Sequence, residues 1–109
     1  PWQPAVLRLV QLTVEGASQE STGREGAAKP VGVCGEAAAD PALAVVLTGL
    51  GVTTLSMTAR SLAAVGTVLK TVTLEQAQEL AQLALSAPSA LEARDWVRAK
   101  LPVLEELGL

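Results

Sequence analysis

Apolar side chains recur every three or four positions near the start of the chain, which is the spacing of one helix face. We expect a helix over residues 4–15 or beyond, with Pro4 tolerated in its first turn. Its predicted apolar face consists of Val6, Leu9, Val10, Thr13, Val14 and Ala17. Residues 20–26 are polar and contain two glycines, which predicts a surface loop.

Two short apolar runs predict β-strands. Residues 31–35 read Val-Gly-Val-Cys-Gly between Pro30 and Glu36, a pattern typical of a buried parallel strand. Residues 52–57 form the second candidate. We expect residues 36–39, which follow the first run, to form a loop.

Four more helices are predicted, and helix-start residues mark most of them. Asp40 and Pro41 have the types preferred at the N-cap and the first helical position, so a helix should run from there to Gly49-Leu50-Gly51. Thr58 is expected to cap a helix over residues 59–70. The stripe of that helix consists of Leu62, Val65 and Leu69.

The last two helices are expected over residues 74–86 and 90–107. Thr73 with Gln76, and Ser89 with Glu92, have the spacing of a capping box. Pro102 should kink the last helix or split off its end, because proline cannot donate the helical hydrogen bond.

The predicted order is helix, strand, helix, strand and then three helices, which indicates parallel βα units in an α/β fold. Two strands are too few to form a sheet buried on both faces. We therefore expect the last two βα units of a (β/α)8 TIM barrel plus terminal helices. Residues 1–4 lack an initiator Met, so we expect a piece of a longer protein, with simple processing as the alternative.

The amino-acid composition and the charge exclude several classes of function. Of the 109 residues, 50% are hydrophobic and 17% are charged, which excludes a disordered tail. The net charge is −3 and the basic residues are scattered, so neither nucleic acid nor an anionic membrane is an expected partner. A helix-turn-helix over residues 74–97 has little support for the same reason. No apolar run approaches the roughly 20 residues of a membrane span.

The numbers of cysteine and histidine residues limit which disulfides and metal sites the chain could form. One cysteine cannot form an internal disulfide, which fits a reducing cytoplasm. With no His, a structural zinc site is not expected.

One stretch of sequence carries a family signature. Residues 32–36 read Gly-Val-Cys-Gly-Glu, and they are followed by Asp40-Pro41, by Gly49-Leu50-Gly51 and by Leu55-Ser56-Met57. This pattern resembles the Enzyme I family of phosphoenolpyruvate (PEP)–protein phosphotransferases of the bacterial sugar phosphotransferase system. The resemblance is specific over residues 30–57 and looser elsewhere. Residues 23–29 look like a longer connection than the family's.

The resemblance implies that the chain is the C-terminal fragment of a PEP-binding TIM barrel. In that family PEP gives its phosphoryl group to a histidine and then to the carrier protein HPr, releasing pyruvate. Cys34 would be the residue that protonates carbon, and Gly35 would leave room for the substrate. A thiol suits this role, since it holds its proton at neutral pH but can release it.

Each candidate residue has a structural alternative. A lone Cys in an apolar strand is more often a small buried hydrophobe. Glu36 could hydrogen-bond near the site or cap backbone groups. Ser56 and Met57 would lie near the same face of a barrel as Cys34, and local backbone contacts for Ser56 and core filling for Met57 are the favoured roles. Arg60 could reach an anion at the barrel mouth or could be solvated.

The chain also lacks parts that the family's reaction needs. It has no histidine, and the resemblance implies that the substrate-clamping arginines and the Mg²⁺ ligands lie upstream. The resemblance also implies Mg²⁺ as cofactor and a cytoplasmic, homodimeric parent. Because those parts are missing, we expect weak or no PEP binding by this chain alone. Two alternatives remain open. One is a fragment of pyruvate phosphate dikinase or PEP synthase. The other is a helical self-association module without catalysis.

Overall fold

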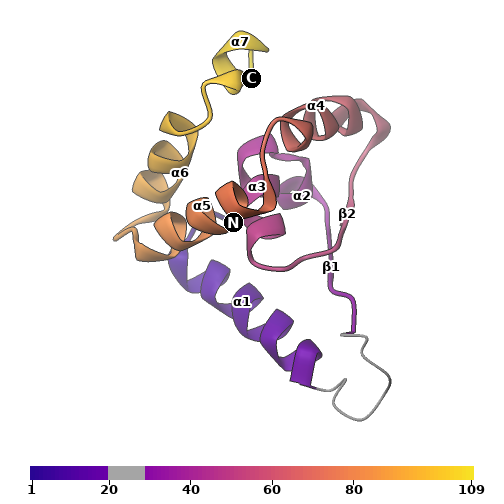
Figure 1. Ribbon diagram of the computed structural model, residues 1–109, viewed down its shortest axis with the longest axis vertical. Coiled ribbons are helices and arrows are strands. Elements are labelled where there is room, and N and C mark those ends of the chain that lie inside the picture. The colour runs from indigo at the N-terminus through magenta and orange to yellow at the C-terminus, as the bar shows by residue number, and fades with distance from the viewer. Residues whose placement is uncertain (20–28) are drawn as a thin grey trace.

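The computed structural model describes residues 1–19 and 29–109, in which helices pack against one side of a two-stranded parallel sheet (Figure 1). The predicted α/β element order is confirmed. The predicted loop at 20–26 lies outside the described residues, as does the long connection at 23–29 apart from Lys29. The elements are α1 (Pro4–Gln19), β1 (Gly32–Cys34), α2 (Glu36–Ala39), α3 (Pro41–Gly49), β2 (Thr54–Ser56), α4 (Ala59–Lys70), α5 (Leu74–Ser86), α6 (Ala90–Ala99) and α7 (Val103–Glu106).

The sheet pairs β1 with β2 in parallel, and Val33 lies opposite Leu55. These two side chains pack against the hydrophobic core. The opposite face carries Gly32, Cys34, Thr54 and Ser56, and all four are exposed. None of the described elements covers this face, so the predicted burial of the first strand is not seen there within the described residues.

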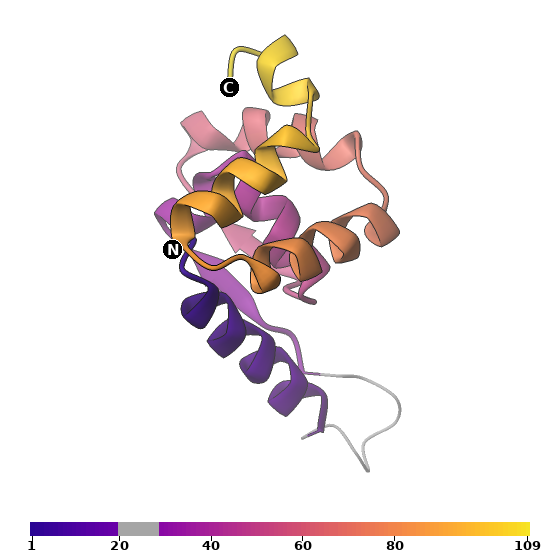
Figure 2. The ribbon, with the colours of Figure 1, turned by 90° about the vertical axis from the view of Figure 1, so that its left-hand side faces the viewer.

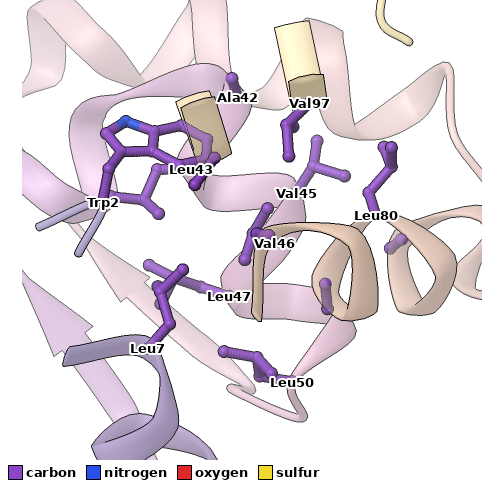
Figure 3. Close-up of a cluster of buried hydrophobic side chains, with 14 of the residues drawn as sticks. Trp2, Leu7, Ala42, Leu43, Val45, Val46, Leu47, Leu50, Leu80 and Val97 are labelled. Atoms are coloured by element: carbon purple, nitrogen blue, oxygen red, sulfur yellow. The ribbon is translucent and has the colours of Figure 1, made fainter. Parts of the chain in front are cut away.

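Helix α3 forms the centre of the core. Every residue from Ala42 to Leu47 is buried, as expected for a helix that is apolar on all sides. Helices α5, α4 and α6 contact it, and Figure 2 shows α5 and α6 lying in front of it. In Figure 3, Val45 and Val46 of α3 lie between Leu80 of α5 and Leu7 of α1.

Asp40 caps this central helix, as the sequence predicts. Its Oδ1 accepts hydrogen bonds from the backbone N–H groups of Ala42 (3.1 Å) and Leu43 (3.3 Å). Its Oδ2 accepts a third bond, 2.9 Å long, from Nε1 of Trp2, whose side chain is only 6% exposed. The Asp40 carboxylate therefore links the segment before α1 to the core helix through hydrogen bonds. No local sequence pattern indicates this contact of Trp2.

Replacing Asp40 with Ala should lower the free energy of unfolding by about 1–2 kcal/mol, because it removes both the cap and the partner of the Trp2 indole. Urea unfolding followed by tryptophan fluorescence would measure this. The matched control is Asp95→Ala, which removes an exposed carboxylate from α6. Equal effects of the two substitutions would contradict the role given to Asp40.

Two glycines end α3 and let other helices approach it. Gly51 has φ of 104°, its N–H donates to the carbonyl of Thr48 (3.0 Å), and that of Val52 donates to Leu47 (3.1 Å). This is the Schellman ending, and it confirms the predicted stop. A Cβ at Gly51 would lie 2.7 Å from Cγ1 of Val14 in α1, and one at Gly49 would overlap the carbonyl of Ala77 in α5.

Two predictions need correction. Residues 36–39 form the one-turn helix α2 rather than a loop, because three successive alanines favour helix and Ala38 is fully buried. The buried face of α1 is also wrong in part. Leu7 is fully buried, whereas Leu9 is 63% exposed. Helix α1 carries apolar side chains on two sides, so their spacing alone does not identify the side that faces the core.

The remaining helix ends mostly follow the sequence. Thr73 and Gln76 form a complete capping box, and the Ser89 hydroxyl accepts from the Glu92 N–H (3.2 Å). Thr58 precedes α4, but its side chain caps no backbone group. Pro102 separates α6 from α7, so the end of the predicted last helix is split off.

Candidate active site

The carboxyl ends of the two strands lie side by side and bring Cys34 next to Ser56. The register pairs these two residues directly across the parallel strands. Cys34 is exposed and its thiol is free. Cys34 is therefore not part of the core that the described residues form, and its role in the longer protein stays a prediction. The position at the end of the strand, predicted from the sequence, is confirmed.

Gly35 turns the chain away from β1 directly after Cys34. Its φ of 90° and ψ of −155° lie in a region that favours glycine. Its N–H donates to the carbonyl of Ser56 (3.1 Å), and its own carbonyl accepts from the N–H of Ala39 (3.2 Å). A Cβ at Gly35 would meet nothing within 4 Å, so the space beside the residue is open. Substrate contact at Gly35 stays a prediction.

Glu36 starts α2 and is exposed. Its carbonyl accepts from the N–H of Asp40 (3.1 Å), which is a contact of the main chain. Within residues 1–19 and 29–109, no hydrogen bond of its carboxylate is seen, so the predicted backbone cap by this side chain is absent there. Arg60 is likewise exposed in the first turn of α4, and its reach toward an anion stays a prediction.

Alternation along the strand separates Ser56 from its neighbours Leu55 and Met57. Leu55 and Met57 line an apolar hollow of about 380 Å³ together with Leu62, Val65 and Leu69 of α4. Leu62, predicted on the buried stripe, is 59% exposed at this hollow. Ser56 faces the other way, toward the side of Cys34, and its hydroxyl makes no hydrogen bond within the described part of the chain.

The described residues gather no group of three His, Cys, Asp or Glu side chains that could hold a metal ion. Among the described helices, none is both long enough and apolar enough to cross a membrane.

The sequence was compared with known protein families and curated proteins. Residues 1–74 match the family described as PEP-utilising enzyme, PEP-binding domain. A phosphoenolpyruvate-protein phosphotransferase of Streptomyces coelicolor is 54% identical over 93% of this chain and 17% of its own length. A multiphosphoryl transfer protein of Xanthomonas campestris is 41% identical, over 84% of this chain and 10% of its own.

A phosphoenolpyruvate-protein phosphotransferase of Bacillus subtilis is 33% identical over 90% of this chain and 16% of its own length. The chain thus spans less than a fifth of each of these relatives, and the match lies in their C-terminal part. The family match covers well over half of the chain and includes both strands and Cys34. The chain therefore belongs to the family of PEP-utilising enzymes, in their PEP-binding domain.

Proposed function

We propose that this chain is the C-terminal part of a PEP–protein phosphotransferase and that Cys34 protonates the carbon of the enolate. The observation that carries the proposal is the exposed, free thiol at the carboxyl end of β1. Enzymes built on (β/α)8 barrels place their reacting groups at this end of the strands. The relatives named as PEP–protein phosphotransferases support the same activity.

The proposal includes a barrel, of which this chain would form the last two βα units. Two features support it. The strands are parallel, and the side chains of Val33 and Leu55 face the helices. The uncovered face carries only the small residues Gly32, Cys34, Thr54 and Ser56. We propose that this face lines the barrel interior, where further strands of the longer protein would cover it.

In the proposed reaction, a histidine of the longer protein attacks the phosphorus of PEP. The bond between phosphorus and the enol oxygen breaks, and an enolate remains. The Cys34 Sγ–H bond then breaks as its proton forms a C–H bond at C3, which gives pyruvate and a thiolate. Water returns the proton to Cys34. The open space beside Gly35 is where the three-carbon substrate would fit.

Among the described residues, no group of three His, Cys, Asp or Glu side chains could hold a metal ion. We propose that the Mg²⁺ ligands and the substrate-clamping arginines belong to the preceding part of the longer protein. A cytoplasmic location is part of the same proposal.

The phosphoryl acceptor distinguishes the proposed function from its nearest alternative. Full-length protein incubated with PEP should phosphorylate HPr in the absence of any nucleotide. Mass spectrometry of HPr would detect the added phosphoryl group. Transfer to a nucleotide instead would indicate a dikinase or synthase and would contradict the proposal.

The 109-residue chain alone should bind PEP too weakly to detect by titration calorimetry at millimolar PEP. The described part offers no cluster of cations around Cys34, and an anionic substrate needs such partners. The full-length protein with Mg²⁺ is the control and should show binding. Tight binding by the short chain would mean that its own residues form the anion site.

We also propose that the full-length protein is a homodimer. Val6, Leu9 and Leu12 of α1 are each more than 40% exposed, and such apolar surface favours association. Light scattering on a sizing column would measure the mass. A monomer at micromolar concentration would contradict this part of the proposal.

A further inference from the structure

Ser56 lies next to Cys34 at the ends of the two strands, but the proposed function gives Ser56 no role. The two residues are register partners at the ends of neighbouring parallel strands. Partners in a parallel ladder project their side chains to the same face of the sheet. Both are exposed on the face opposite Val33 and Leu55. The Ser56 hydroxyl therefore lies beside the Cys34 thiol.

The spacing of side chains on this face is known from the preceding pair. Gly32 and Thr54 are register partners one pleat before Cys34 and Ser56. A Cβ built at Gly32 lies 3.5 Å from Cβ of Thr54, so neighbouring side chains on this face are in contact. The bond from the Gly35 N–H to the Ser56 carbonyl (3.1 Å) continues the same register beyond Cys34. The side chains of Ser56 and Cys34, as register partners, are therefore neighbours on this face.

The Ser56 hydroxyl has no competing partner in the part of the chain that the structure describes. Thr13, Thr48 and Thr67, by contrast, donate their hydroxyl protons to carbonyls of the preceding helical turn. No such bond of the Ser56 hydroxyl is seen among the described residues. Its hydrogen-bonding capacity is therefore available to a neighbouring side chain or to water.

We propose that Ser56 is a positioning residue for Cys34: its hydroxyl donates a hydrogen bond to the thiolate that remains after the thiol has protonated the enolate. This inference rests on the proposed function of Cys34. No proton leaves Ser56 in this step; the hydroxyl fixes the rotamer of Cys34 and stabilises the charge on sulfur. Hydrogen bonds to a charged acceptor are stronger than those between neutral groups.

The ionisable side chains nearest to this pair along the chain belong to Glu36 in α2 and Arg60 in α4. Helix α2 contacts both strands and α4. Both side chains are exposed, and their charges are the same in every variant proposed below. A difference between variants therefore reports on the hydroxyl.

The test is the pH profile of alkylation of Cys34 by iodoacetamide in this 109-residue chain, whose single cysteine makes the signal specific. Ser56→Ala should move the midpoint of the profile upward by about 0.5–1 pH unit, because the thiolate loses a hydrogen bond. Ser56→Thr keeps a hydroxyl at this position and should restore the original midpoint. The matched control is Thr54→Ala, which removes a hydroxyl from the same strand face beside Gly32 and should leave the midpoint unchanged.

Circular dichroism of each variant shows whether the fold is retained, which is expected because Ser56 is exposed. An unchanged midpoint in Ser56→Ala, or an equal shift in Thr54→Ala, would overturn the inference. The alkylation profile requires no substrate, so its failure is distinct from failure of the proposed function. The latter is decided by turnover of the Cys34→Ala variant of the full-length protein.

Discussion

Replacing Cys34 with Ala in the full-length protein should lower the rate of pyruvate formation from PEP by about 10²–10⁴-fold. The substitution removes the group that delivers a proton to carbon, and alanine has no proton to give. Cys34 belongs to no buried cluster of the described residues, and circular dichroism of the full-length variant would show whether its fold is retained. A coupled assay for pyruvate with HPr present would measure the loss.

Thr54→Ala is the matched control for this experiment. It truncates a side chain on the same uncovered strand face, one pleat before the paired ends of the strands. Its turnover should fall far less than that of Cys34→Ala, since no step of the proposed reaction uses the Thr54 side chain. Near-wild-type turnover of the Cys34→Ala variant would mean that this thiol delivers no proton.

Gly49→Ala should destabilise the fold by about 2–4 kcal/mol, the range of severe overpacking in a core. A Cβ at this position would overlap the carbonyl of Ala77, which is backbone and cannot turn aside. Helix α5 would have to move away from α3, and these two helices share the most extensive contact in the structure. Chemical denaturation monitored by circular dichroism would give the change in the free energy of unfolding.

Two other helical glycines provide controls with the opposite expected sign. Gly16 in α1 and Gly66 in α4 have nothing within 4 Å of an added Cβ. Alanine at either position should stabilise the fold by about 0.5–1 kcal/mol through its higher helix propensity. If Gly49→Ala also proved stabilising, the close contact between α3 and α5 would be wrong.

The order and type of the elements could be predicted because local signals marked most boundaries. Asp40 and Pro41 mark the start of α3, Gly51 marks its end, and Pro102 separates α6 from α7. The one-turn helix α2 was missed, since four residues are too few to show a helical period.

The features that sequence patterns did not predict depend on tertiary contacts. The choice between the two apolar sides of α1 is made by packing, which buries Leu7 and leaves Leu9 exposed. The bond from Trp2 to Asp40 spans 38 positions, so no local pattern indicates it. Position 49 requires glycine because the backbone of Ala77, 28 residues further along the chain, lies directly against it.

The sequence predicts more of the candidate site than of the helix packing. A strand that ends in Cys34 and a second parallel strand that ends near Ser56 must bring both residues to one edge. The sequence does not show that the Ser56 hydroxyl lacks a hydrogen-bond partner within the described residues. That property depends on which acceptors lie nearby in the fold.

The most direct test of Cys34 as the proton donor follows the proton itself. Full-length protein is held in D₂O with HPr and with PEP and pyruvate at equilibrium, and the methyl protons of pyruvate are followed by NMR. In the reverse direction the thiolate removes a methyl proton and the thiol exchanges it with solvent. We predict that wild type replaces these protons with deuterium and that Cys34→Ala does so at least about 100-fold more slowly. Exchange at the wild-type rate in Cys34→Ala would contradict the assignment.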